Sequence, residues 1–290
     1  MPKKINIQSI KKLDKSLKAK EKLFSTKLDK NYDGFGKTAQ KQLNTFKSGY
    51  RKDFKPDKKQ QEKLRQDLQK YFKDIQKTAL TSAKKDLFSK AVNKDVKIKI
   101  TAITANKTSK ANDKWAAKLA EKQIKDYNRI INDSIKKAIK VNPNISKAEL
   151  KALIDAKTTA FKNIRTKTTT GNETNRIQNQ TRLEAYRDSG IVQGVVFTAV
   201  LDLRTTQNCI DKDGTKIEVN DPRLQYYMIP QHLNCRSTLV PVFIGDKFKV
   251  TNTATINRHL LRFGKLKQPE GQPIYFLLED QIFYEFYEVA

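Results

Sequence analysis

Apolar residues recur every three or four positions along the first half of the chain, which is the spacing of one face of an α-helix. The pattern predicts amphipathic helices over residues 7–28 and 38–46, with a turn at residues 32–36, where two glycines occur. Longer helices are predicted over residues 58–92 and 112–140. The first part of the chain is therefore expected to be mainly helical.

Two local sequence patterns predict where a helix begins and where it breaks in the middle of the chain. Ser146 and Glu149 have the form of a capping box, in which each side chain accepts a free backbone N–H, so a helix is expected from there towards Phe161. The threonine-rich stretch at residues 166–172 ends in glycine and asparagine and predicts a break. A further helix is predicted over residues 173–188.

Strand patterns appear mainly beyond Gly190, a residue type that often ends a helix. Residues 192–201 form an apolar, β-branched run typical of a buried strand, and residues 238–244 form another, with a turn expected at the Asp-Gly pair 213–214. A shorter alternating stretch at residues 96–103 also favours a strand. The predicted fold class is α+β, with long amphipathic helices first and then a small α+β module with a few short strands.

The net positive charge of the chain is confined to residues 1–170. Residues 1–170 hold 45 Lys and Arg against 17 Asp and Glu, whereas residues 171–290 hold 14 of each. Lysine supplies 41 of the early cations, and its mobile ammonium suits diffuse attraction to a polyanion such as DNA; simple solvation of lysines encoded by an AT-rich genome is the alternative. We expect a lysine-rich helical region at residues 1–140, a compact module at 141–245 and an aromatic-rich extension at 246–290.

The content of cysteine, histidine and apolar residues indicates the compartment in which the protein assembles and argues against a membrane span. Two cysteines and two histidines are too few for a disulfide framework and no secretion signal is visible, so we expect assembly in a reducing cytoplasm. No apolar stretch reaches the length of about 18 residues that a membrane span needs. Residues 274–289 are aromatic but interrupted by acidic residues, which fits an element packed on the body or a docking surface. Few aromatics accompany the lysines, so any DNA contact is expected to ignore base sequence.

Both cysteines and one histidine lie in a dense constellation of polar residues. Cys209, His232 and Cys235 are residue types that bind zinc. The acidic residues that could supply a fourth ligand are Asp202, Asp211 and Asp213. The alternative is that the cysteines are small buried residues and the histidine closes the loop through a local hydrogen bond. A cysteine nucleophile with His232 as its base is a further alternative, although no oxyanion hole or substrate pocket is marked.

Charged side chains support two more predictions. Asp202, Arg204 and Arg236 form a charged cluster at the strand ends, where an arginine fork is expected to clamp a carboxylate in a structural role; a binding site is the alternative. On the preceding helix, polar residues recur every three positions and so share one face. These residues are Glu173, Arg176, Asn179 and Arg182. The face is interpreted either as solvated or as a surface for a partner protein.

The constellation has a fixed order, in which an Asp-x-Arg-Thr motif after a strand leads to a cysteine, an Asp-Gly turn, a histidine and an Asn-Cys-Arg motif. The residues are Asp202, Arg204, Thr205, Cys209, Asp213, Gly214, His232, Asn234, Cys235 and Arg236, closed by Leu239 and Pro241. This order resembles the C-terminal signature of the Mu F-like minor head proteins of tailed phages. The likeness covers roughly residues 140–245, including Asn175 and Tyr186 upstream. We expect the stretch that ends at Cys209 to fold against the stretch that begins at His232.

The resemblance implies a non-enzymatic, low-copy structural protein of the virion, located in the capsid interior or at the portal vertex. Its implied partners are the portal, the major capsid protein and packaged DNA, with which it can be ejected. A DNA-binding protein of the phage head without sequence specificity is the second hypothesis. The chain departs from the family at residues 170–172, where an Ala-Arg-Thr motif is common, and at Thr206 and Ser237, where many members have cysteines. A four-cysteine metal site is therefore excluded.

Overall fold

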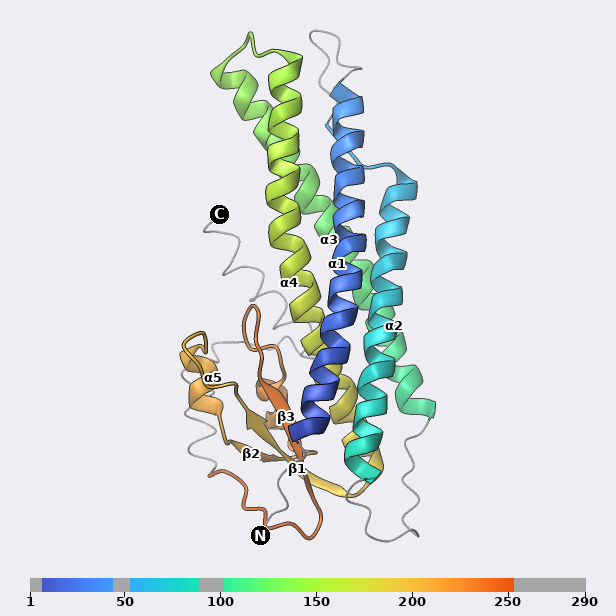
Figure 1. Cartoon of the computed structure of the whole chain (residues 1–290), viewed down its shortest axis with the longest axis vertical. Helices are drawn as coiled ribbons and strands as arrows, with labels where there is room; N and C mark the ends of the chain where they lie inside the picture. Colours follow the sequence, from blue (N-terminus) through green and yellow to red (C-terminus); the bar gives the residue numbers. More distant parts are fainter. Residues whose placement is uncertain (1–6, 44–52, 89–101, 253–290) are drawn as a thin grey trace. The chain divides into compact units, whose positions relative to one another are not determined.

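The computed structural model describes residues 7–43, 53–88 and 102–252 of the chain. In order, their elements are α1 (Ile7–Leu43), α2 (Lys58–Phe88), α3 (Ala102–Val141), α4 (Lys147–Ser189), β1 (Val192–Thr198), α5 (Gln207–Lys212), β2 (Lys216–Glu218), the 3-10 helix η1 (Pro222–Tyr227) and β3 (Thr238–Phe243) (Figure 1). Long helices followed by a small sheet confirm the predicted α+β class.

The chain divides into two compact units, each built from segments that are far apart in the sequence. Within the described residues, the helical unit consists of residues 15–43, 53–75 and 107–170, and the sheet unit consists of residues 7–14, 76–88, 102–106 and 171–252. Because one boundary falls inside each of α1, α2, α3 and α4, all four helices contribute residues to both units. The division after residues 140 and 245 that the sequence suggests stays a prediction.

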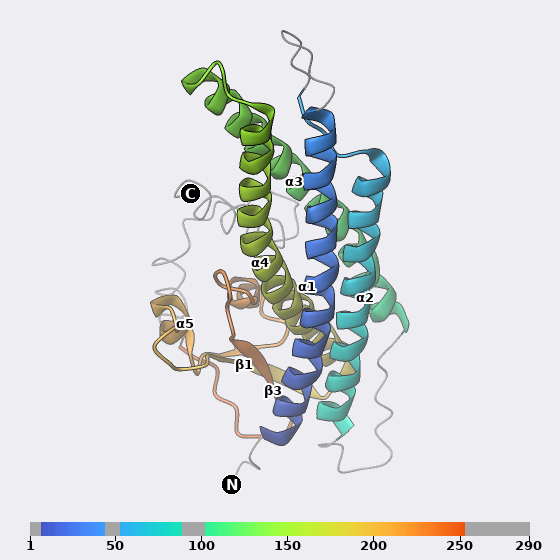
Figure 2. The ribbon, with the colours of Figure 1, turned by 45° about the horizontal axis from the view of Figure 1, so that its top comes forward.

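The helical unit is a bundle in which consecutive helices run in opposite directions. Phe24 of α1 stacks on Tyr71 of α2 with ring centroids 3.9 Å apart, whereas Asn31, later in α1, donates a hydrogen bond to Asp67, earlier in α2. This reversed register makes α1 and α2 antiparallel, and the same alternation continues through α3 and α4 (Figure 2). The amphipathic pattern of the sequence thus becomes a bundle whose apolar faces point inward.

Aromatic side chains from different helices meet around Tyr127 in the middle of the bundle. The Tyr127 ring lies 5.5 Å from Phe35, 5.7 Å from Phe54 and 5.2 Å from Phe161, measured between ring centroids. Its hydroxyl lies 2.7 Å from the hydroxyl of Thr158, so the buried phenol has a hydrogen-bond partner. This cluster joins α1, α3 and α4 and the segment before α2 into one core.

The turn predicted at residues 32–36 is wrong, because α1 continues through it without interruption. Tyr32 and Phe35 are fully buried there, and burying two aromatic side chains outweighs the cost of about 1 kcal/mol for each glycine in a helix. Gly36 has a packing role, since a Cβ at this position would lie only 3.0 Å from the side chain of Thr158 on α4. The glycine therefore permits α1 and α4 to approach closely.

The start of α4 follows the prediction. The Ser146 hydroxyl accepts the Glu149 N–H at 3.2 Å, and the Glu149 carboxylate accepts the Ser146 N–H at 2.7 Å. These reciprocal hydrogen bonds are the predicted capping box, and they satisfy two donors that the first turn would leave free.

The break predicted at residues 166–172 is wrong, since α4 is continuous from Lys147 to Ser189. The buried threonine hydroxyls have partners that fit a helix. Thr166 donates to Asp29 at 2.7 Å, Thr169 accepts from Gln123 at 2.7 Å, and Thr170 donates to the Thr166 carbonyl at 2.9 Å. The change in composition marks the boundary between the two units at Thr170 instead of the end of a helix.

The sheet unit contains a three-stranded antiparallel sheet in the order β2-β1-β3. Gly190, with φ +66°, follows the last residue of α4, as predicted. Val195 in the central strand lies opposite Ile217 of β2 and Pro241 of β3. Side chains from the ends of α2 and α4, including Leu87, pack with the sheet into one apolar core. β1 and β3 correspond to the two predicted strands, whereas α5, β2 and η1 were not predicted.

Several expectations concern residues outside the described ranges. These are the ends of the helices predicted to residues 46 and 92, most of the strand predicted at 96–103, and the aromatic stretch at 274–289. Within the described part, residues 102 and 103 of that strand begin α3 instead. As expected, no helix of the described residues has the length and apolar character needed to cross a membrane.

Candidate functional site

Polar side chains of α4 hold the segment that contains the Asn-Cys-Arg motif. The Asn172 side chain accepts the backbone N–H of Asn234 at 2.7 Å, and the Asn175 amide donates to the Cys235 carbonyl. One turn later, the Asn179 side chain accepts the N–H of Leu239 at 3.0 Å. The helix therefore binds the backbone of this segment at three successive points.

A buried ion pair continues this contact to β3 and α2. The Arg182 guanidinium donates to Asp86 of α2 at 3.0 Å, to the Tyr186 hydroxyl at 3.0 Å and to the Thr238 hydroxyl at 3.1 Å. Tyr186 also donates to Asp86 at 2.9 Å. Burial lowers the pKa of Arg182, but attraction by Tyr186 and Asp86 outweighs it and raises the pKa overall. Arg182 therefore stays charged inside the unit.

The four residues predicted to form a partner surface make their contacts inside the chain. Asn179 and Arg182 are buried, and the Glu173–Arg176 pair, 2.8 Å apart, exposes only about a tenth of each side chain, 10% and 12%. These contacts speak against a partner surface on this face. The sequence did not reveal the role of Asp86, because it lies 96 residues before Arg182 in the chain.

The Asp202 carboxylate joins the loop after β1 to the residue that follows Cys235. The Arg236 guanidinium donates two hydrogen bonds to it, both 2.6 Å long, which is the predicted arginine fork. Asp202 also accepts the backbone N–H of Arg204 at 2.9 Å and the hydroxyl of Thr205 at 3.2 Å. The hydrogen bonds from Arg236 hold the pKa of Asp202 well below its usual range. The Asp-x-Arg-Thr motif thus organises a loop.

The Asp-Gly pair closes the connection from α5 to β2. Asp213 accepts the backbone N–H of Ala199 at 2.8 Å through its carboxylate, and Gly214 donates its N–H to the Phe197 carbonyl at 2.9 Å. Gly214 has φ +73°, a conformation that glycine adopts without strain. This geometry agrees with the turn expected from the sequence.

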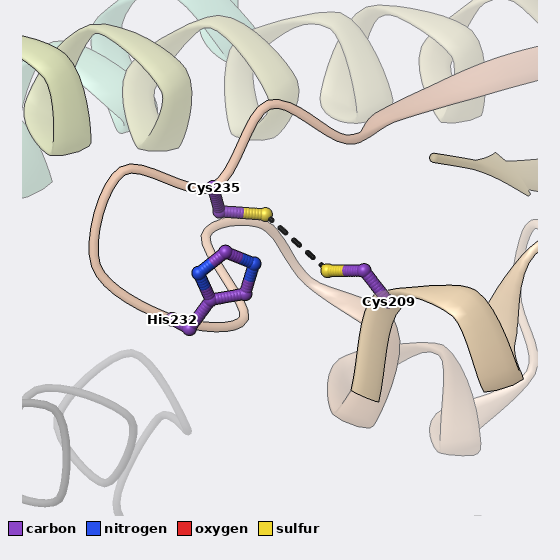
Figure 3. A group of neighbouring side chains, drawn as sticks. All are labelled: Cys209, His232 and Cys235. Carbon is purple, nitrogen blue, oxygen red and sulfur yellow. Dashed lines mark hydrogen bonds between the residues drawn. The ribbon is translucent and has the colours of Figure 1, made fainter. Parts of the chain in front are cut away.

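Cys209, His232 and Cys235 come together in the sheet unit (Figure 3). The two sulfur atoms are 3.8 Å apart, and the nearest ligand atoms of all three side chains lie within 4.8 Å of one another. Both cysteines are buried, and His232 is half-buried. The two stretches expected to fold against each other are therefore in contact, although 26 residues separate the two cysteines.

Hydrogen bonds within the cluster shift the pKa values of its three side chains. The hydrogen bond from Cys209 lowers the pKa of Cys235, and the same bond raises the pKa of the Cys209 thiol. Burial lowers the pKa of His232, but its hydrogen bond with Cys235 outweighs this, so the pKa is raised. Of the two thiols, Cys235 is therefore the one that loses its proton more readily.

A buried lysine beside the cluster escaped prediction from the sequence. Lys212, the last residue of α5, donates to the Tyr226 carbonyl at 3.2 Å and to the Gln231 side chain. Burial lowers the pKa of Lys212 to about 8, while attraction by Cys209 and Cys235 opposes that shift. Lys212 lies between two aspartates in the sequence, a pattern typical of an exposed residue, so its burial could not be predicted.

The cluster has the residue types for metal binding or thiol chemistry. A thiolate with an adjacent imidazole could act as a nucleophile, but both sulfur atoms are buried, which restricts the access of a substrate. The acidic residues proposed as a fourth ligand have other partners. Asp202 pairs with Arg236, Asp213 binds Ala199, and Asp211 accepts a hydrogen bond from Gln207 at 2.6 Å.

A known protein family matches the part of the chain that contains most of these contacts. Residues 129–240 match the family described as Phage Mu protein F like protein. The match contains α4, the Asp202 loop and the Cys209, His232 and Cys235 cluster, so it confirms the resemblance read from the signature. No curated protein and no solved structure matches the chain significantly.

Proposed function

We propose that this chain, which carries a Phage Mu F-like region at residues 129–240, is a minor structural protein of a tailed-phage head. The family points to head morphogenesis, and one observation carries the proposal. The signature residues of the match form a connected set of contacts that holds the loop after β1 and the segment before β3 against α4. Such contacts suit a structural module.

We further propose that the chain binds the portal or the major capsid protein through the loop after β1. Leu201 and Leu203 are exposed there, with 63% and 107% of their surface accessible, while the Asp202–Arg236 fork holds the loop. Exposed leucines on an ordered loop suit a protein partner, because contact with it removes apolar surface from water without much loss of loop entropy. This partner would place the protein at the portal vertex or in the capsid interior.

Co-purification tests this interaction. The full chain is co-expressed with the portal and major capsid proteins of the same phage, and the double variant Leu201→Ser with Leu203→Ser is compared with the wild type. Leu23→Ser is the matched control, since Leu23 is also exposed, at 71%, but lies on α1. We expect the double variant to lose most of the co-purified partner and the control to retain it. Equal recovery with all three chains would contradict the proposed contact.

The placement of lysines favours a second activity, contact with packaged DNA without sequence specificity. In the helical unit, no lysine whose side chain is described is buried. Solvated ammonium groups can exchange for the counterions of DNA, which gives affinity that falls with salt. The same protein could hold DNA through these lysines and a head protein through the sheet unit. The second hypothesis is that DNA binding is the principal role.

Salt-dependent binding to double-stranded DNA separates the hypotheses. Four exposed lysines of α1, Lys22, Lys30, Lys37 and Lys41, are replaced by glutamine, or by arginine as a charge-preserving control. If all four contact phosphates, the glutamine variant should reduce the slope of log affinity against log salt by about 3.6. Wild-type DNA binding together with failure to bind any head protein would favour the second hypothesis. An unchanged slope would refute DNA contact by these lysines.

A further inference from the structure

We propose that Cys209, His232 and Cys235 bind a zinc ion that joins α5 to the segment before β3. The three side chains come from two parts of the sheet unit and converge on one point (Figure 3). Two thiolates and a neutral imidazole are ligands that zinc prefers, and two thiolates balance its charge. This inference does not depend on the proposed role in the phage head.

The distance between the sulfur atoms fits the geometry of zinc. With a zinc–sulfur bond of about 2.3 Å and a tetrahedral angle, two thiolate ligands lie about 3.8 Å apart. Cys209 and Cys235 have their sulfur atoms 3.8 Å apart. A disulfide requires about 2.05 Å, so the two side chains would have to move closer together to form one.

His232 is oriented for metal binding through one ring nitrogen. Its Nδ1 lies 2.9 Å from the Leu233 carbonyl, which can accept a proton held on that nitrogen. The other ring nitrogen, Nε2, faces the two sulfur atoms (Figure 3). A backbone carbonyl that binds the far nitrogen of a histidine ligand fixes its tautomer and ring orientation, as in many zinc sites.

The backbone around the ligands is held independently of any ion. The Cys235 N–H donates to the His232 carbonyl at 3.1 Å, which closes a turn through Asn234, whose φ is +57°. Asn172 and Asn175 of α4 bind the backbone of this turn. On the other side, the Cys209 N–H donates to the Thr206 carbonyl at 3.0 Å in the first turn of α5. The ligands are thus placed by the fold before the ion binds.

Three protein ligands leave one position of a tetrahedral site, which we assign to water. Within the described residues, the cluster contains no fourth metal-binding side chain, and the nearby acidic groups have other partners. The ion would mainly link α5 to the segment before β3 and so stabilise the fold.

Metal analysis of the full chain tests the proposal. The protein is purified under reducing conditions, stripped with a chelator and returned to zinc, and its metal content and melting temperature are measured. We expect about one zinc per chain and a melting temperature that falls on stripping and recovers with zinc. Cobalt(II) in place of zinc should give the absorption of a tetrahedral site with thiolate ligands. These measurements need no variant and so do not depend on a substitution being tolerated.

Variants identify the ligands. Cys209→Ser, Cys235→Ser and His232→Ala should each lose most of the bound metal, whereas Asp211→Asn should keep it because Asp211 is not a ligand. A stripped wild-type chain with unchanged melting temperature and no uptake of zinc or cobalt would overturn the proposal. Equal zinc binding by wild type and Cys209→Ser would also overturn it, as would a native protein whose two thiols are both oxidised and metal-free.

Discussion

Replacing Asp86 with asparagine tests whether the contacts of α4 hold the sheet unit together. Asp86 is on α2 and pairs with Arg182, whose side chain is only 7% exposed, at 3.0 Å. The substitution keeps the shape of the side chain but removes its charge, so the guanidinium stays buried without a counter-ion. Tyr186, which donates to the same carboxylate oxygen at 2.9 Å, loses a charged acceptor as well.

The size of the effect follows from burial. Removing one partner of a buried ion pair costs about 3–5 kcal/mol, since the remaining charge cannot return to water. The Asp86 side chain is 20% exposed, so solvent partly screens this site and we expect the lower end, about 3 kcal/mol. That loss corresponds to a fall of roughly 6–12 °C in melting temperature for a domain of 150–250 residues.

Urea unfolding followed by circular dichroism measures the loss in free energy of unfolding. Asp33→Asn is the matched control, because Asp33 is 48% exposed and pairs with Lys162 at 2.8 Å, so it should lose no more than about 1 kcal/mol. Asp86→Asn combined with Arg182→Met should be less harmful than Asp86→Asn alone, because no charge is left unpaired. If Asp86→Asn costs no more than the Asp33 control, the inferred role of the buried pair is refuted.

Three further predictions use other parts of the fold. Ser146→Ala should lower the free energy of urea unfolding by about 1 kcal/mol through loss of the helix cap, and an unchanged midpoint would contradict the capping role. Asn179→Ala should cost about 1–3 kcal/mol in the same assay, since it leaves the buried Leu239 N–H without its acceptor; a change below half a kcal/mol would argue against that bond. Burial raises the pKa of Tyr127 to about 12, so the unfolded chain loses this proton first, from about pH 10, and stability should fall as pH rises from there towards 12. Tyr127→Phe should flatten that fall relative to wild type in unfolding measured across this pH range, and parallel curves would contradict the assignment.

The sequence predicts those parts of the fold that depend on local patterns. The Ser146–Glu149 cap, the stop at Gly190 and the strand that begins at Val192 each follow from a few neighbouring residues. The turn at residues 32–36 and the break at residues 166–172 fail for a common reason. Glycines and threonines that favour turns in isolation are held in helices by partners from distant parts of the chain, which local patterns do not include.

The sequence was sufficient to group the residues of the signature, but it did not predict the contacts that these residues make. Residue order grouped Cys209, His232 and Cys235, and the structure places them in contact. The polar face of α4 was interpreted as solvated or partner-binding, whereas Asn179 and Arg182 bind β3. A polar residue on a helix has the same appearance in the sequence whether it meets water or a backbone N–H, so only the three-dimensional contacts distinguish the two.

Quantitative mass spectrometry of purified phage proheads and virions tests the central claim most directly. If the chain is a minor head protein, its peptides should be present in proheads or virions after nuclease and salt washing, at a small fraction of the amount of major capsid protein. They should also be depleted from particles assembled with the Leu201→Ser and Leu203→Ser variant. Absence of the wild-type chain from both kinds of particle, despite its expression in the infected cell, would contradict the account.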